Sequence, residues 1–131
     1  MQIARLTGSV RIDELDKIIQ GLDAVAINPD LIESLDEIDL AYHLAKASFD
    51  NNKNIGKKLK YEFLLWLSCT RDIKNALKKT APHSTKDFIL IMFSGKFALV
   101  HKMIGKKKPL KLKKKGSPTR LEKISLARII S

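Results

Sequence analysis

A basic segment near the middle of the chain contains the residues best suited to bind a ligand. It runs from Lys53 to Lys58 as Lys-Asn-Ile-Gly-Lys-Lys, and two further cations, Lys60 and Arg71, follow it. Lysine and arginine beside a helix N-terminus suit phosphate groups, which they bind without reading a nucleotide sequence. Asn54 and Ile55 could meet an unstacked nucleotide through a hydrogen bond and an apolar contact. The alternative is a solvated surface with one salt-bridged arginine, and the residues by themselves favour neither.

Arg71 is unusual for its expected position at the start of a helix. Thr70 is a good N-cap, and Asp72 places a negative charge in the first turn, where the helix dipole favours it. A cation at the same end is disfavoured by about 0.3–1 kcal/mol when it is exposed. A bound anion would offset this cost. Arg71 and the free backbone amides of that turn are therefore predicted to form an anion site.

The helix expected over Leu59–Leu67 is almost entirely apolar, since only Lys60 and Glu62 in it are charged. Such a helix is buried on most of its circumference. A carboxylate within it needs a polar partner. We expect Glu62 to have a structural role and to accept hydrogen bonds from the loop Asn52–Gly56.

The sequence contains none of the motifs that typically mark an enzyme. It has no glycine-rich phosphate loop, no His-x-Glu or Cys-x-x-Cys metal pair and no nucleophile elbow. His43 follows Asp39 by four residues, which suits a surface hydrogen bond better than acid–base catalysis. Cys69 precedes Arg71, which could lower the thiol pKa, but a small buried residue is the favoured interpretation. We expect no catalytic residue, no metal site, no cofactor and no enzymatic activity.

Charge is unevenly distributed along the chain. Its 131 residues carry a formal net charge of +11 at pH 7. Residues 1–50 contain four basic and ten acidic residues, whereas residues 51–131 contain 21 basic and 4 acidic ones. The split predicts one acidic surface and one surface suited to a polyanion. Lys102–Lys115 contains eight lysines and no aromatic residue, so we expect it to attract phosphate without stacking on bases.

Length and composition predict a single domain over residues 1–131. Cys69 is the lone cysteine, which fits a reducing cytoplasm and excludes an intramolecular disulfide. The first twenty residues lack an apolar signal region, and no apolar run is long enough to span a bilayer. We therefore expect a soluble cytoplasmic protein.

Buried strands and intervening helices predict an α/β or α+β fold, with a small mixed sheet and several helices packed against it. Phe97–Ile104 fits either a helix or the second strand of a hairpin, and we take it as a helix. The expected strands are Ile3–Val10, Leu22–Ile27, Phe88–Phe93 and an edge strand at Leu110–Leu112. The other expected helices are Asp13–Gln20, Ser34–Phe49, Leu59–Leu67, Thr70–Thr80 and one that begins at Ser117-Pro118.

Several residues at fixed spacing resemble the core motif of a known family. They are Asn54-Ile55-Gly56, Leu59, Glu62-Phe63-Leu64-Leu65, Thr70-Arg71-Asp72-Ile73 and Ala76. This set resembles the small kinase-binding subunit of the KEOPS (EKC) complex, which makes threonylcarbamoyladenosine on tRNA. The family commonly has Asn-Ile-(Ala/Ser), then Glu-(Phe/Ile)-Leu-Leu, then Gly-Thr-Arg-Gln-Ile. Here Cys69 replaces the glycine and Asp72 the glutamine, and the resemblance extends over about Leu22 to Phe93.

The resemblance implies a non-enzymatic subunit that binds the complex's small atypical kinase and the 3′ CCA end of tRNA. The alternative is a protein-only regulator of that kinase, whose basic surface only confers solubility. The acidic first fifty residues could meet a basic surface of the kinase, and no single residue is named as central to that contact. Charge reversals at Asp36, Glu37 and Asp39 would test this placement. The RNA-binding residues expected from the loop and the resemblance are Asn54, Ile55, Gly56, Lys57, Lys58, Lys60, Thr70, Arg71 and Ile73.

Overall fold

The computed structural model of the chain describes residues 1–96 and 104–130, which fall into two units. The first unit combines Met1–Leu31 with Ala81–Lys111, and the second combines Ile32–Thr80 with Leu112–Ser131. Each unit therefore takes segments from both halves of the chain. The two units are described in turn.

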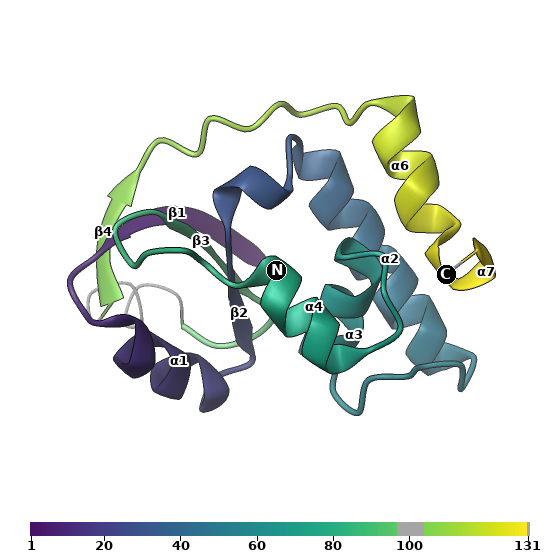
Figure 1. Cartoon of the computed structure of the whole chain (residues 1–131), viewed down its shortest axis with the longest axis horizontal. Helices are drawn as coiled ribbons and strands as arrows, with labels where there is room; N and C mark the ends of the chain where they lie inside the picture. Colours follow the sequence, from purple (N-terminus) through teal and green to yellow (C-terminus); the bar gives the residue numbers. More distant parts are fainter. Residues whose placement is uncertain (97–103, 131) are drawn as a thin grey trace. The chain divides into compact units, whose positions relative to one another are not determined.

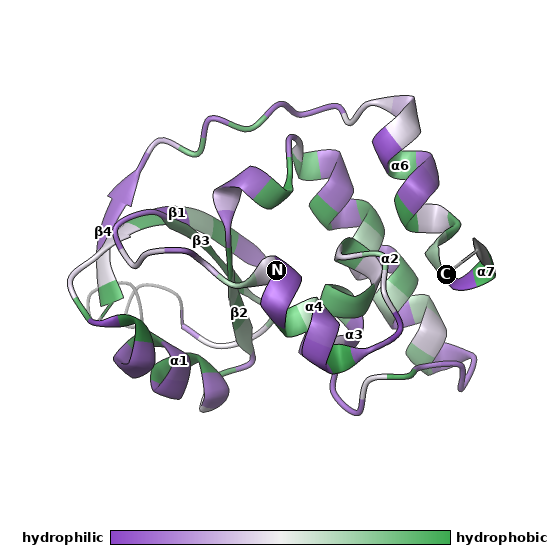
Figure 2. Cartoon of the chain, viewed as in Figure 1, coloured by the Kyte–Doolittle hydropathy of each residue, from purple (hydrophilic) through white to green (hydrophobic). Residues whose placement is uncertain are grey.

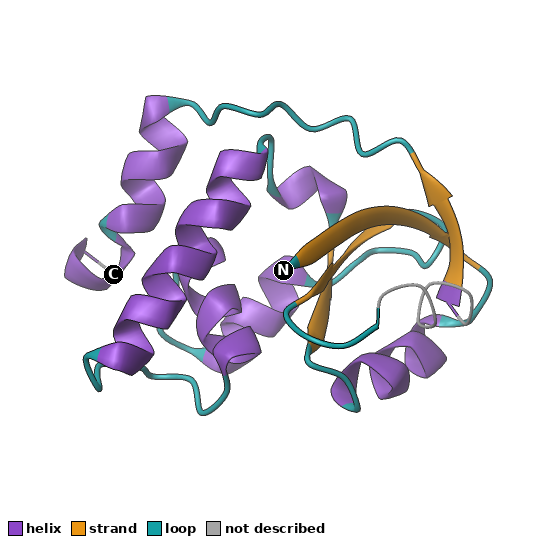
Figure 3. Ribbon diagram, turned by 180° about the vertical axis from the view of Figure 1, so that it is seen from behind, coloured by secondary structure: helices purple, strands orange, loops and turns teal. Residues whose placement is uncertain are grey.

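The first unit is built on a four-stranded antiparallel sheet, shown in orange in Figure 3. The strand order is β2-β3-β1-β4, so β3 and β1 are central and β2 and β4 are the edges. All five residues of β3 are buried, in agreement with the continuous apolar run from which this strand was predicted. The strands are β1 (Gln2–Gly8), β2 (Ala24–Ile27), β3 (Phe88–Met92) and β4 (Gly105–Lys108).

Helix α1 (Ile12–Gln20) contributes apolar side chains to the core of this unit. Leu15 is fully buried, and Ile18 and Ile19 pack beside it, because the three lie on one helical face. The predicted strands at Ile3–Val10, Leu22–Ile27 and Phe88–Phe93 and the predicted helix after residue 12 are all confirmed, with ends shifted by one to two residues.

The predicted edge strand at Leu110–Leu112 is wrong, because the edge strand is β4, a few residues earlier. Lys111 has φ 54°, a left-handed conformation that interrupts an extended strand. In β4, Lys106 and Lys107 are exposed, as expected for lysines on a sheet edge. The helix expected over Phe97–Ile104 lies almost wholly outside the described residues.

The second unit is helical and consists of α2 (Leu35–Asp50), α3 (Leu59–Leu67), α4 (Ile73–Thr80), α6 (Pro118–Ser125) and α7 (Ala127–Ile130). Helix α2 is the longest, and both α3 and α6 pack against it. Figures 1 and 3 show α6 beside α2 from opposite sides. Helix α3 is coloured mostly hydrophobic in Figure 2, and seven of its nine residues are buried.

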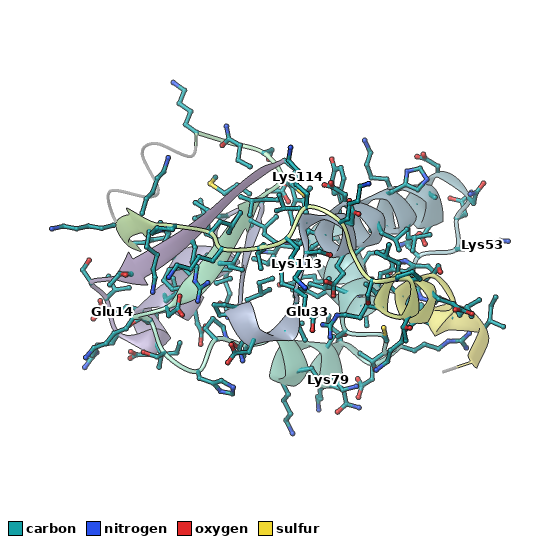
Figure 4. All side chains as sticks on the ribbon, turned by 90° about the horizontal axis from the view of Figure 1, so that it is seen from above. Glu14, Glu33, Lys53, Lys79, Lys113 and Lys114 are labelled. Carbon is teal, nitrogen blue, oxygen red and sulfur yellow. The ribbon has the colours of Figure 1, made fainter. Side chains whose placement is uncertain are left out.

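The N-terminus of α2 begins where the sequence indicates. Ser34 accepts a hydrogen bond from the Glu37 amide, and the Glu37 carboxylate accepts one from the Ser34 amide, which completes a capping box. The next two free amides donate to the carbonyls of Lys113 and Lys114, in the extended segment that leads to α6 (Figure 4). This segment therefore fastens α6 to the start of α2.

A tight turn joins α3 to α4. The amide of Cys69 donates to the Trp66 carbonyl and that of Thr70 to the Leu65 carbonyl, the pattern of a Schellman cap. Cys69 occupies the left-handed position of this cap, with φ 57°. Glycine adopts this conformation without strain, whereas a residue with a Cβ does not.

The fold class, a mixture of helices and strands, is confirmed. Every pairing between the described strands is antiparallel, so the prediction of a mixed sheet is wrong. The fold belongs to the α+β alternative, and the strand pairs need no crossover helix. Among the described helices, none is both long and apolar enough to cross a membrane.

Candidate functional site

Glu62 is the centre of the candidate site, which lies wholly within the second unit. Its side chain is fully buried in the first turn of α3. One carboxylate oxygen, Oε1, accepts hydrogen bonds of 2.9 Å from the amides of both Ile55 and Gly56. The predicted structural role of Glu62 as an acceptor for the preceding loop is confirmed, and its carboxylate fixes the path of that loop.

Arg128 from helix α7 supplies the positive charge that this buried carboxylate requires. Its Nη2 donates to Glu62 Oε2 at 2.7 Å, and its Nη1 donates to the Lys53 carbonyl at 3.2 Å. The guanidinium also lies 4.5 Å from the ring centre of Trp66, a cation–π contact. The Trp66 indole in turn donates to Ser48 Oγ at 3.1 Å.

Glycine is required at position 56 because the loop runs against the backbone of α3. A Cβ on Gly56 would lie 2.7 Å from the Glu62 nitrogen and 3.1 Å from the Tyr61 carbonyl carbon. These are backbone atoms that cannot move aside alone. The loop can therefore approach the helix closely enough to donate its amides to Glu62 only without a side chain at this position.

A cavity of about 430 Å³ opens beside this loop. Its walls combine apolar side chains with three cationic ones, so it suits a ligand that has both a planar or apolar part and negative charge. Trp66 and Ile55 belong to the apolar part, and Ile55 is 46% exposed. The cations are Lys53, Arg71 and Arg128.

Arg71 precedes α4, whereas the sequence predicts it at the start of that helix. The helix begins at Ile73, and Asp72 is its cap: its carboxylate accepts from the Lys74 amide at 3.1 Å, and its carbonyl from the Ala76 amide. Thr70, the expected cap, instead accepts from the Asp72 amide at 3.2 Å. The Asp72 carboxylate thus takes one of the helix amides from which the anion site was predicted.

The guanidinium of Arg71 has a different partner. Its Nη2 donates to the backbone carbonyl of Arg128, and the Arg71 side chain lines the cavity. Arg71 is nevertheless exposed. The site thus keeps Arg71, but α7 orients its charge rather than the dipole of α4.

The expected RNA-binding residues are only partly brought together. Ile55 and Arg71 line the cavity. Lys57 and Lys58 are exposed on the same loop, and Lys53, which precedes it, extends outward in Figure 4. A third group is buried or half-buried and is not among the residues that line the cavity: Asn54, Gly56, Thr70 and Ile73.

Lys60 must be removed from the expected set. Its side chain is buried to 3% exposure, and its ammonium lies 5.4 Å from the ring centre of Tyr61. A lysine in this position cannot reach an external phosphate. Asn54 is also engaged, since its side-chain amide donates to the Gly56 carbonyl at 2.9 Å and so braces the loop.

Two of the three acidic residues chosen to test the kinase contact have structural roles. Glu37 is 2% exposed and pairs with Arg120 at 2.8 Å, and Asp36 accepts from the Gly116 amide at 2.9 Å. Burial raises the pKa of Glu37, but hydrogen bonds from Arg120, Ser34 and the Glu33 amide outweigh it and hold the pKa below 4.5. Only Asp39 of the three is exposed.

Histidine and cysteine take no part in the site. His43 and His83 are exposed, and His101 lies outside the described residues. Within residues 1–96 and 104–130, no group of three or more His, Cys, Asp or Glu side chains could hold a metal ion. Burial raises the pKa of the Cys69 thiol against the pull of Lys123 and Lys79, so the structure does not favour the activated thiol considered from the sequence.

Sequence reasoning missed Arg128 and the tryptophan face on which it lies. The need of a buried carboxylate for a cation predicts that such a partner exists, but nothing in the spacing indicates an arginine 66 positions later. The lysines of the Lys102–Lys115 segment also differ in role, because Lys108 pairs with Asp87 at 3.2 Å.

No protein-family model matches the chain, and no curated protein matches it either.

Proposed function

We propose that this protein is a non-enzymatic, cytoplasmic subunit of the tRNA threonylcarbamoylation complex that binds the 3′ end of tRNA and the complex's small atypical kinase. The observation that carries the RNA part is the cavity beside the Glu62-anchored loop. It combines apolar walls with Lys53, Arg71 and Arg128. An unstacked terminal nucleotide offers the matching chemistry, a flat base and a phosphate.

The turn between α3 and α4 supports the resemblance on which this proposal depends. The family pattern has glycine where this chain has Cys69, and Cys69 adopts the left-handed conformation that glycine adopts freely. Gly56 is a point of difference, since the family has Ala or Ser there and a Cβ would meet backbone atoms at 2.7 Å. In this chain the loop therefore lies closer to the helix than a side chain would allow.

A filter-binding titration with tRNA over a salt series tests the RNA part most directly. Binding through phosphate contacts releases counterions, so affinity should fall steeply as salt rises. In a plot of the logarithm of the binding constant against the logarithm of the salt concentration, each contacted phosphate should add about −0.7 to −0.9 to the slope. Absence of tRNA binding at low salt would remove the RNA part of the proposal.

A second candidate is a protein-only regulator of the kinase. It is favoured by one observation: the Arg71 guanidinium and the Asn54 amide, two main RNA candidates, already have partners within the protein. Pull-down of the kinase with and without tRNA separates the two functions. Kinase capture without any tRNA binding would leave the second candidate alone.

Asp39 offers a clean test of an acidic kinase contact. It is exposed on α2, whereas changes at Asp36 or Glu37 would disturb the α2 cap and the Arg120 pair. If α2 meets a basic kinase surface, Asp39→Lys should slow association by about tenfold at low salt, with a smaller effect at high salt. An unchanged association rate at low salt would place the kinase contact elsewhere.

We also propose that the protein has no turnover of its own. The supporting observation is the absence of a phosphate-binding loop and of a metal-ligand pair from the sequence. Purified protein should hydrolyse ATP at no more than the rate of a buffer blank. ATP hydrolysis that keeps a constant specific activity through several columns would contradict this.

A further inference from the structure

Arg128 contacts four residues of the candidate site. Its guanidinium bonds to the buried Glu62 carboxylate and to the Lys53 carbonyl, at the start of the loop, and it lies over the ring of Trp66. Its own carbonyl accepts from Arg71. These four contacts come from one residue in the short helix α7, far from the others in sequence.

The loop depends on the Glu62 carboxylate being held in place. Glu62 is fully buried, and its two carboxylate oxygens have different partners. Oε1 accepts hydrogen bonds from the amides of Ile55 and Gly56, and Oε2 accepts one from Arg128. A buried carboxylate without a cation is strongly disfavoured. Loss of the Arg128 charge therefore weakens the hydrogen bonds that shape the loop, although Arg128 does not bond to either amide.

Arg128 also acts on Arg71, through its backbone carbonyl in α7. The Arg71 side chain is long and exposed, so without a partner it would sample many rotamers. The Arg128 carbonyl fixes its guanidinium at the cavity wall. One residue thus contacts both the loop and the arginine that line the cavity.

We propose that Arg128 is a positioning residue for the candidate RNA site, acting through Glu62 on the loop Lys53–Gly56 and through its carbonyl on Arg71. This inference rests on the proposed function. The loop-ordering role can be measured without RNA, so failure of one can be told from failure of the other.

Hydrogen exchange of the Ile55 and Gly56 amides tests the positioning role directly. Arg128→Met keeps an unbranched apolar stem over Trp66 and removes the guanidinium, so both amides should exchange at least about tenfold faster than in wild type. Arg128→Lys restores a charge for Glu62 and should recover much of the protection. Rescue by lysine separates a charge effect from simple loss of packing.

Arg120→Met is the matched control. Like Arg128, Arg120 lies in a C-terminal helix and pairs with a buried glutamate, Glu37, at 2.8 Å. Replacing Arg120 by methionine removes the same charge as Arg128→Met. Arg120 is not among the residues that line the cavity. Its variant should leave the Ile55 and Gly56 exchange rates within about twofold of wild type.

Trp66 fluorescence provides a second measurement, which can be made even if a variant is less stable than the wild type. Trp66 is the single tryptophan of the chain and lies under the Arg128 guanidinium. Its fluorescence should change in Arg128→Met and remain unchanged in Arg120→Met. This measurement applies even where Arg128→Met is less stable, provided that circular dichroism at low temperature shows a folded protein.

tRNA binding completes the test. Arg128→Met should weaken binding at least about tenfold, while Arg120→Met should weaken it by no more than the loss of one distant charge, about twofold. Unchanged exchange of the Ile55 and Gly56 amides in Arg128→Met would overturn the positioning role, whatever the result of the tRNA-binding measurement. Absence of tRNA binding by the wild type would overturn the RNA site, and faster exchange would then still establish Arg128 as the residue that orders the loop.

Discussion

Glu62 decides the conformation of the candidate site through a single carboxylate. Glu62→Ala would leave two loop amides and the Arg128 guanidinium without their acceptor in a buried position. Breaking a buried ion pair in this way costs about 3–5 kcal/mol of unfolding free energy. Urea unfolding should show this loss, with the exposed Glu122→Ala as control at less than about 0.5 kcal/mol. A loss below about 1 kcal/mol would mean that the loop does not depend on Glu62.

Glu37 predicts an acid dependence of stability. Its pKa is below 4.5 in the fold, so its ionised form contributes stability that is present above pH 4.5 and is lost as pH falls through the lowered pKa. Arg120→Met removes the strongest hydrogen bond that lowers this pKa. The stability difference between wild type and Arg120→Met should therefore be largest at pH 7 and shrink below pH 4.5, as measured by urea unfolding. A difference that stays constant between pH 7 and pH 3 would contradict this assignment.

At the scale of single residues, the sequence showed that Glu62 requires polar partners, but it did not identify all of the residues that supply them. A lone carboxylate in an apolar helix indicated that the nearby loop would donate to Glu62, which is confirmed. Arg71 was among the cations predicted beside the loop, but the cation that pairs with Glu62 is Arg128. Partners distant in sequence depend on how the helices pack, and periodicity in one segment contains no information about that.

The turn after α3 contains a strained residue that can be tested at the scale of the element. Cys69 has φ 57°, which disfavours a residue with a Cβ by about 1–2 kcal/mol. Cys69→Gly should relieve this strain, whereas Cys69→Ala loses the thiol but keeps the strain. The glycine variant should be more stable than the alanine variant by about 1 kcal/mol in urea unfolding. Equal stability would mean that the turn is not held in the left-handed conformation.

Helix starts could be predicted where the cap is local and unambiguous. Ser34 with Glu37 three residues later defines the start of α2, and Ser117 before Pro118 defines that of α6. Two candidate caps compete at α4, and the structure uses Asp72 rather than Thr70. The edge strand was misplaced for a similar reason, because the left-handed φ of Lys111 is not visible in a run of lysines and leucines.

At the scale of the whole chain, the charge split in the sequence does not correspond to the two units. Residues 1–50 are net negative and residues 51–131 net positive, yet each unit combines segments from both ranges. The acidic residues are also partly consumed by the fold, since Glu37 pairs with Arg120. Charge counted along the sequence therefore overstates how far acidic and basic surfaces are separated.

The RNA site depends on one combined measurement: tRNA binding by wild type and Arg71→Ala, each with full-length tRNA and with tRNA lacking its 3′ end. If the cavity holds the terminal nucleotide, Arg71→Ala should weaken binding by about 1.5–3 kcal/mol, the scale of a charged hydrogen bond. Removing the 3′ end should weaken wild-type binding but add little to the Arg71→Ala loss, because both changes remove the same contact. Equal melting temperatures of the two proteins serve as the control for fold. Additive losses, or binding that is insensitive to both changes, would contradict a 3′-end site at Arg71.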